Sequence, residues 1–365
     1  MNPFDKLHLT IYGESHSPEI GGILCGLPAG ESFRPEAVAR LMERRKSGKY
    51  LFSTPRREED AVVWSGVAER DGKLEIAGDI EAKIVNANIR PSDYSYTATP
   101  RPSHADFTAY AKWGKAGVKS GGGKFSGRMT APLVALGAVA KELLAARGIA
   151  VEAYISELAG VKGRSFAEGV PTVEEVRECH DAPLPMLAQI GRATESARAA
   201  AEKGDSVGGI IECVVYSLPA GVGDAMFGGL ESKISAAVYA VPAVKGVAFG
   251  AGFDIARMTG SEANDAFVMR DGKVRTLTNN SGGINGGVSN GMPVTVSVAI
   301  RPTPSISLPQ RTVNLETGEE CEIVVRGRHD ATVVPRAVAA VESAVALAVL
   351  DEVLVREEEI VKTER

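Results

Sequence analysis

The sequence predicts an α+β fold in which antiparallel β-sheets pack against helices. Strand-like and helix-like segments come in mixed order along the 365 residues, without the regular alternation that a parallel, doubly wound sheet requires. Some of the helix-like segments are apolar nearly all round, which is typical of buried helices. The hydrophobic share of 44% is enough for a large core and argues against disorder. Because no linker-like stretch divides the chain, residues 1–365 are predicted to form a single domain.

The helices are predicted from periodicity and from signals at their ends. Residues 35–46 open with a proline at a first helical position, and residues 131–146 form an apolar segment that stops before Gly148. Thr172 and Glu175 have the spacing of a capping box at the start of a more polar helix. Two more helices are predicted at 193–203 and 335–355. Strands are predicted at 61–67, 83–89, 149–155, 210–218 and 293–300.

Composition narrows the classes of function. The formal net charge of −5 gives no global signal for nucleic-acid binding. The N-terminal residues lack the basic and apolar blocks of a signal peptide, and charged residues interrupt the most apolar stretches, so we expect a cytoplasmic protein without a membrane span. The four cysteines are far apart and the histidines show no ligand spacing, so we expect reduced thiols and no bound metal.

The strongest chemical signal is a glycine-rich segment at residues 120–128, which opens the apolar segment at 131–146. Its glycines would let the backbone approach a ligand closely. The N–H groups of a helix start, together with Lys124, Ser126 and Arg128, suit a phosphate. A flexible loop followed by a helix cap remains the alternative, because no complete Walker pattern is present.

A second segment, residues 279–291, is rich in glycine, asparagine and serine and runs directly into a predicted strand. So many permissive residues favour a backbone-lined cofactor wall over an extended surface loop. Residues 301–305 close that strand with two prolines and two hydroxyl side chains, which by themselves also fit a simple edge turn. Gly-Arg pairs precede both the 131–146 and the 335–355 helices, an echo that fits either an internal duplication or chance.

Basic residues cluster between Arg44 and Arg57, which indicates an anion site or, alternatively, a solvated helix end. Histidines lie in three distinctive contexts. His16 directly follows a predicted strand, His104 lies in the segment Arg-Pro-Ser-His-Ala-Asp at 101–106, and His329 adjoins Asp330. Histidine carries protons near neutral pH, although a single histidine is more often a surface or satisfied core residue.

Taken together, these segments resemble the chorismate synthase family. Residues 13–16 resemble its N-terminal Gly-Glu-Ser-His motif, and residues 126–130 resemble its central motif. Residues 328–330, with Pro335, Arg336 and Glu342 beyond them, resemble its C-terminal motif, and residues 101–106 are similar to its Arg-Pro-Gly-His-Ala-Asp segment. The matches follow the family order over nearly the whole chain, which makes them far more specific than any single motif.

The resemblance implies a layered β-α-β sandwich and, in most members, a homotetramer. It also implies reduced FMN as cofactor and the elimination of phosphate from 5-enolpyruvylshikimate 3-phosphate, with His16, His104 and Asp330 as the catalytic residues. The flavin would be lined by Lys124, Phe125, Ser126, Pro242, Ala243, Gly286, Arg301, Pro302, Thr303, Pro304, Ser305 and Arg328. The substrate carries two carboxylates and a phosphate, so arginines must bind it, and the candidates are Arg45, Arg57 and Arg128.

The sequence departs from the family pattern at several positions, among them Ser17, Leu51, Ser103 and Met129. None of these changes removes a motif histidine or Asp330. The sequence leaves open whether NADPH serves as the reductant of FMN or an external reductase is needed. Two alternative functions also remain: a flavin-dependent oxidoreductase, and a non-catalytic phosphate- or nucleotide-binding protein.

Overall fold

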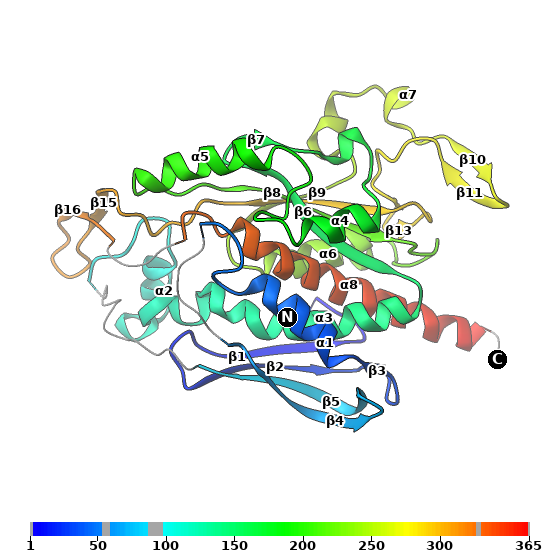
Figure 1. The fold of residues 1–365 in the computed structure, drawn as a ribbon, viewed down its shortest axis with the longest axis horizontal. Coiled ribbons are helices and arrows are strands. Elements are labelled where there is room, and N and C mark those ends of the chain that lie inside the picture. Colours follow the sequence, from blue (N-terminus) through cyan, green and yellow to red (C-terminus); the bar gives the residue numbers. More distant parts are fainter. Residues whose placement is uncertain (1–2, 53–58, 87–97, 326–329, 364–365) are drawn as a thin grey trace.

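The computed structural model describes residues 3–52, 59–86, 98–325 and 330–363. It contains two five-stranded antiparallel sheets with helices packed between them (Figure 1). The first sheet comprises β1 (His8–Gly13), β2 (Glu19–Cys25), β3 (Ser32–Phe33), β4 (Val62–Arg70) and β5 (Lys73–Val85). The second comprises β6 (Ala150–Leu158), β7 (Val161–Lys162), β8 (Gly209–Tyr216), β9 (Val244–Phe249) and β14 (Val294–Ile300). The predicted α+β class and the layered β-α-β arrangement are therefore confirmed.

The middle layer holds α1 (Pro35–Arg45), α3 (Thr130–Ala146), α6 (Leu230–Tyr239) and α8 (Val334–Thr363). The outer face of the second sheet carries α4 (Val173–Cys179) and α5 (Ile190–Glu202), and α2 (Asp106–Trp113) lies at one end of the layers (Figure 1). Smaller elements are α7 (Gly260–Ala263) and the hairpins β10 (Phe267–Arg270)–β11 (Lys273–Thr276), β12 (Ile284–Asn285)–β13 (Val288–Ser289) and β15 (Gln310–Val313)–β16 (Glu320–Ile323). Single 3-10 turns occur at Lys115–Gly117, Gly127–Met129, Phe166–Glu168 and Met226–Gly228. Longer segments of this kind occur at Gly252–Arg257 and at Ser120–Phe125, where the glycines interrupt the helical backbone.

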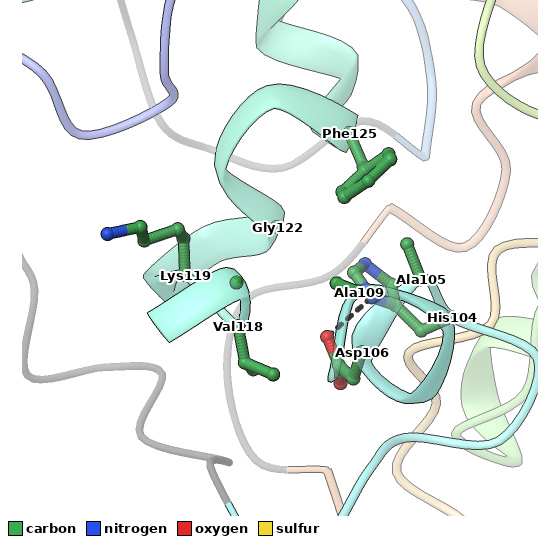
Figure 2. Close-up of a pocket in the computed structure, with 9 residues that line it drawn as sticks. His104, Ala105, Asp106, Ala109, Val118, Lys119, Gly122 and Phe125 are labelled. Carbon is green, nitrogen blue, oxygen red and sulfur yellow. Dashed lines mark hydrogen bonds and ion pairs between the residues drawn. The ribbon is translucent and has the colours of Figure 1, made fainter. Parts of the chain in front are cut away.

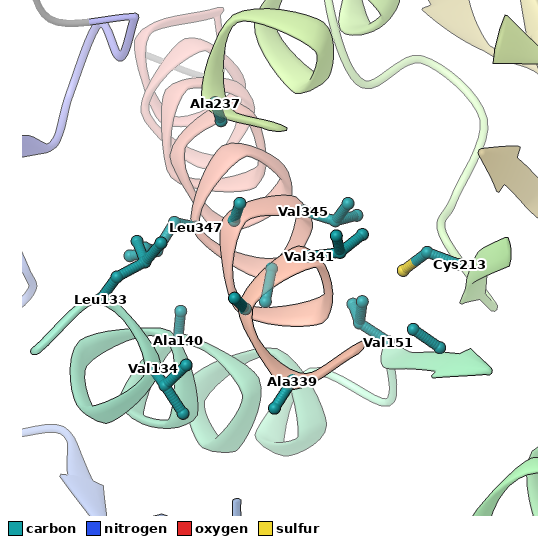
Figure 3. Close-up of a cluster of buried hydrophobic side chains, with 14 of the residues drawn as sticks. Leu133, Val134, Ala140, Val151, Cys213, Ala237, Ala339, Val341, Val345 and Leu347 are labelled. Carbon is teal, nitrogen blue, oxygen red and sulfur yellow. The ribbon is translucent and has the colours of Figure 1, made fainter. Parts of the chain in front are cut away.

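The core lies where α3 and α8 pack against each other and against both sheets. Side chains such as Val134, Val341 and Val345 are completely buried there (Figure 3). The two helix backbones approach so closely at Gly137 that a Cβ atom on it would lie 2.2 Å from the Cβ atom of Ser343. Only glycine fits this crossing, and the close approach explains why both helices are rich in small residues.

The segment 127–146 is long and apolar enough to cross a membrane by length and composition, and 72% of its apolar window is buried inside the protein. Its apolarity is therefore accounted for by its place between the sheets and α8. This is the physical reason that a helix of the middle layer has no polar face: both of its sides meet other elements.

Most predicted elements are present, with shifted ends. The capping box is formed, because the Thr172 hydroxyl accepts from the Glu175 N–H and the Glu175 carboxylate accepts from the Thr172 N–H. The strand predicted at 83–89 is the end of β5, which begins ten residues earlier at Lys73, and residues 87–89 lie outside the described residues. The strand orders of the two sheets differ, so the suggested duplication gains no support from topology.

Candidate functional site

Two of the motif histidines meet at one glycine turn. His16 follows β1, and His104 precedes α2, yet both lie against the turn at Ser120–Phe125. A Cβ atom on Gly121 would lie 2.4 Å from Nε2 of His16, and one on Gly122 would lie 3.2 Å from Cε1 of His104. Both glycines have positive φ values, of 63° and 86°. The glycines predicted to approach a ligand thus leave room for the two imidazoles as well.

His104 is held in a network of charged groups. Its Nδ1 lies 2.8 Å from a carboxylate oxygen of Asp106 (Figure 2). The two oxygens of Asp106 also accept from the guanidinium of Arg101 at 2.7 and 2.8 Å. Burial would raise the pKa of Asp106, but the hydrogen bonds from Arg101 and His104 hold that pKa well below its usual value. The carboxylate of Asp106 therefore stays ionised and orients the His104 ring. Because Nδ1 is held by Asp106, the other ring nitrogen, Nε2, points away from that carboxylate.

A small pocket opens beside this network. His104, Asp106, Gly122 and Phe125 line it, together with part of the segment that follows α2 (Figure 2). The ammonium group of Lys124 lies 3.7 Å above the ring of Trp113, at the exposed side of the same turn. The turn thus brings Lys124 and Phe125, both predicted to line a flavin, next to His104.

Two predicted substrate-binding arginines share one buried carboxylate. Nη1 of Arg45 lies 2.6 Å from Asp60, and Arg128 forms a second ion pair with the other oxygen of Asp60. Burial would raise the pKa of Asp60, but the two guanidiniums keep it lowered. Arg45 is 2% exposed, which rules out the alternative of a solvated helix end for this residue. Two guanidiniums are thus gathered at one carboxylate, and such a cluster of arginines suits an anionic substrate.

Sequence analysis missed two members of this cluster. Asp60 is one, and the other is Asn86, whose side-chain oxygen accepts from Nε of Arg128 at 3.0 Å and whose amide donates to the carbonyl of Ser17 at 2.8 Å. Asn86 thereby joins the histidine loop to the arginine cluster. Neither residue stands out in the sequence, because a single Asp or Asn near a strand end is most often part of a turn.

The segment after β14 reaches residues that flank His104. Ser305 accepts from Arg101 at 3.3 Å, and the guanidinium of Arg301 donates to the carbonyl of Ser103 at 2.8 Å. The Arg301 N–H donates to the carbonyl of Ala243 at 3.0 Å, so Pro242 and Ala243 lie at this end too. Pro302 and Pro304 hold the backbone between these contacts. Of these residues, all except Arg101 and Ser103 were predicted to line one cofactor.

Gly286 is not brought to the same place within the chain. It belongs to the β12–β13 hairpin, which packs on the N-terminal side of β14 and against the start of α6. The seven residues of β14 separate it from Arg301, a span of roughly 20 Å. The prediction that Gly286 contacts the flavin therefore stays a prediction.

The C-terminal motif is only partly described, because Arg328 and His329 lie outside the described residues. The predicted substrate-binding Arg57 lies outside them as well. Asp330 is described, and a carboxylate oxygen of it lies 2.7 Å from Nη1 of Arg336 at the start of α8. Nε of Arg336 donates to the carbonyl of Arg45 at 3.2 Å. Asp330 therefore adjoins the end of α1 that carries the arginine cluster.

Beneath this site, Glu342 of α8 is completely buried and accepts two hydrogen bonds from Arg44, at 3.0 and 2.7 Å. Lys141 pairs with both Glu342 and Glu152. Burial would raise the pKa of Glu342, but Arg44 and Lys141 hold it well below its usual value. The basic cluster is thus split, since Arg44 pairs with the buried Glu342 of the core while Arg45 pairs with Asp60.

His180 completes this network at the end of α4. Burial, with a contribution from Arg44, lowers its pKa to about 4, so its ring is neutral near pH 7. His180, Glu152 and Glu342 offer ligand atoms within 4.8 Å of one another. The carboxylates are already bound by Arg44 and Lys141, whose charges would oppose a metal ion. The group is better described as an ion-pair network than as a metal centre.

Comparisons with known proteins agree with the motifs. A family model described as chorismate synthase matches residues 7–354. The chain belongs to the chorismate synthase family. It is 41% identical over 356 residues to a chorismate synthase from Dehalococcoides mccartyi and 44% identical over 356 residues to one from Archaeoglobus fulgidus, covering 96% of each chain in both cases. A crystal structure of chorismate synthase shares the fold with a TM-score of 0.74 at 24% identity, over 97% of this chain and 93% of that one.

Membership of the chorismate synthase family decides between the three functions left open by the sequence. The chain is an enzyme, a lyase, rather than an oxidoreductase or a non-catalytic binding protein. The backbone shows what the family pattern requires at one position where this chain departs from it. Ser103, where the family has glycine, has a φ of 58°, a left-handed conformation that glycine adopts without strain. Ser17 has a local role, since its hydroxyl accepts from the Glu14 N–H at 2.9 Å.

The glycine turn yields a direct test of the chorismate synthase site. Gly121→Ala would place a methyl group against His16 at a φ of 63°, and because a displacement of about 1 Å can cost roughly 100-fold in rate, we expect turnover to fall by that order. Gly148→Ala is the matched control, since Gly148 has a similar φ of 76°, lies outside every motif, and a Cβ atom there meets nothing within 4 Å. Steady-state turnover and thermal unfolding of both variants would check this. Equal turnover in the two variants would contradict it.

Proposed function

We propose that this chain catalyses the anti-1,4-elimination of phosphate from 5-enolpyruvylshikimate 3-phosphate to give chorismate, the last step of the shikimate pathway, in the cytoplasm and as one domain over residues 1–365. The observation that carries the proposal is the meeting of His16 and His104 at one glycine turn, beside two buried arginines that share Asp60. This arrangement offers proton carriers next to an anion-binding cluster, which is what removal of a phosphate requires.

The residues present fit a flavin mononucleotide. The Oγ1 atom of Thr303 is buried and has no hydrogen-bond partner within the described part of the chain, so it is available to a ligand. Gly121–Gly123 keep the backbone of the turn close to His16, His104 and Lys119, where added side chains would collide, and Lys124 supplies a cation for a phosphate. Lys124, Phe125, Ser126, Pro242, Ala243, Arg301, Pro302, Thr303, Pro304 and Ser305 are the described residues proposed to hold it, with Arg328 and Gly286 as further predicted contacts.

The protein's own groups divide the work as follows. Arg45 and Arg128 bind the carboxylates or phosphate of the substrate, and Arg57 is a further candidate. His16 donates a proton to the departing phosphate. His104, oriented by Asp106, holds the protonation state of the flavin, and Asp330 assists removal of the C6 proton. Reduced FMN, when bound, supplies the electron-rich partner that assists charge development, with no net redox change.

The reaction is tested by an anaerobic assay with photoreduced FMN and the phosphorylated substrate. We expect phosphate and chorismate to appear together, without net oxidation of the flavin. Added NADPH under the same conditions, with oxidised FMN at the start, would show whether the chain reduces its own cofactor or depends on a separate reductase. Net flavin oxidation matching product formation, or no phosphate release, would overturn the proposal.

We also propose that the chain assembles as a homotetramer. Large apolar side chains are exposed on the 3-10 turns at Met226–Gly228 and Gly252–Arg257, at the end of α6 and on the β10–β11 hairpin, where a monomer would leave them in water. They are Met226, Phe227, Tyr239, Phe253, Phe267 and Met269. The β10–β11 hairpin that carries two of them projects from the body of the chain (Figure 1). Light scattering that reports a monomer at micromolar concentration would contradict this.

A further inference from the structure

Arg336 connects two parts of the site that are distant in the sequence. Through Nη1 it binds the carboxylate of Asp330 at 2.7 Å, and through Nε it binds the main-chain carbonyl of Arg45 at 3.2 Å. The guanidinium is 19% exposed and the carboxylate 10% exposed, so both groups are largely shielded from water. A planar guanidinium can make two such bonds in fixed directions, which a lysine ammonium on a flexible stem does not reproduce.

The carbonyl of Arg45, which accepts the hydrogen bond from Arg336, belongs to the last residue of α1. The last four carbonyls of a helix have no partner within the helix and must be satisfied from outside. The side chain of Arg45 leaves the same residue toward Asp60 and Thr130, at 2.6 and 3.1 Å. An arginine from α8 therefore fixes the backbone from which the substrate-binding side chain projects.

We propose that Arg336 is a positioning residue, which locks the Asp330 carboxylate to the end of α1 and so fixes the flavin-side acid relative to the substrate-side Arg45. The inference rests on the proposed function of these two residues. Arg336 itself need touch neither ligand. Its rigid fork holds one group that assists proton removal and the backbone of one that binds an anion, so it acts on both rate and affinity.

The test compares Arg336→Ala, Arg336→Lys and Arg147→Ala with the full-length wild-type protein. Arg147 is the matched control, because it is an arginine of 18% exposure that pairs with Glu357 near the far end of α8. We expect Arg336→Ala to lower kcat roughly 10- to 100-fold and to raise the Kd for the phosphorylated substrate measured by calorimetry on flavin-free protein. Arg336→Lys should recover only part of either loss. Arg147→Ala should change stability without changing kcat or Kd.

Two further readouts separate positioning from general destabilisation. Amide hydrogen exchange in the last turn of α1 should accelerate in Arg336→Ala and not in Arg147→Ala, with or without any ligand. Millimolar guanidinium should restore part of the lost turnover by refilling the vacated position. Combining Arg336→Ala with Asp330→Asn should lower kcat little beyond Asp330→Asn alone, because the two residues act on kcat through one contact.

The outcomes are distinguishable. A wild-type protein that releases no phosphate overturns the proposed function, while the hydrogen-exchange and calorimetric arms still report on Arg336. If the wild type is active and Arg336→Ala retains its kcat, its substrate Kd and its exchange rates, the positioning role is wrong. It is equally wrong if the losses only follow the folded fraction, or if the effects of Arg336→Ala and Asp330→Asn on kcat multiply fully.

Discussion

Replacing His16 with alanine is expected to lower turnover by roughly 10²- to 10⁴-fold, the usual cost of losing a general acid. The imidazole lies against the glycine turn next to the site of the proposed phosphate departure. A smaller side chain removes the proton donor and leaves the glycine backbone in place, so the protein should stay folded and still bind FMN. Single-turnover phosphate release under anaerobic conditions measures this.

The other histidines give the controls. His104→Ala should also lower turnover and, in addition, change the pH dependence of the spectrum of bound reduced flavin, because His104 is proposed to hold the flavin's protonation state. His8 on β1 is exposed and lies outside every motif, so His8→Ala should leave turnover unchanged. His180 is unsuitable as a control, since it is buried against Arg44. Equal, small effects at His8, His16 and His104 would remove both proposed roles.

Arg45→Ala is expected to weaken substrate binding by about 2–5 kcal/mol, the range for deleting one side of a buried charge pair. Flavin affinity in the absence of substrate should change little. Asp60 keeps its ion pair with Arg128, so the remaining carboxylate is not left without a cation. Calorimetric titration with the phosphorylated substrate, and with FMN separately, would show the difference.

The matched control is Arg40→Ala, which deletes an exposed arginine from the same helix. It should leave both affinities unchanged. Because Arg45 is buried, its removal also lowers the free energy of unfolding, so the titrations belong at a temperature where circular dichroism shows each variant folded. Unchanged substrate affinity in a folded Arg45→Ala protein would mean that this cluster holds the fold rather than the substrate.

Local signals in the sequence located the elements that carry the site. Period and capping placed both ends of α1 and α3 and the start of α4 within a residue or two, because the forces that start and end a helix act over one turn. The strands β2 and β3 and the helix α2 were not assigned as elements. Their form depends on partners far along the chain, as when Ser32 of β3 pairs with Glu75 of β5.

In the candidate site, too, some features follow from local sequence and others depend on distant parts of the chain. Motif residues such as His16, His104 and Arg128 are recognisable from the sequence because each lies in a distinctive local pattern. Asp60, Asn86 and the bridging role of Arg336 are not, since Asp60 and Asn86 contact Arg128 across 68 and 42 positions of sequence and Arg336 contacts Arg45 across 291. A side chain's type is visible in the sequence, whereas its partner is set by how the chain folds.

The sequence by itself determined the fold class, the family and which residue types could move protons and bind anions, because these depend on local pattern and chemistry. Only the tertiary structure decided that Arg44 and Arg45, adjacent in one basic cluster, face in different directions. One enters the core to neutralise Glu342, and the other joins Arg128 at Asp60. Successive residues on a helix point about 100° apart, so their fates depend on what packs against each face of α1.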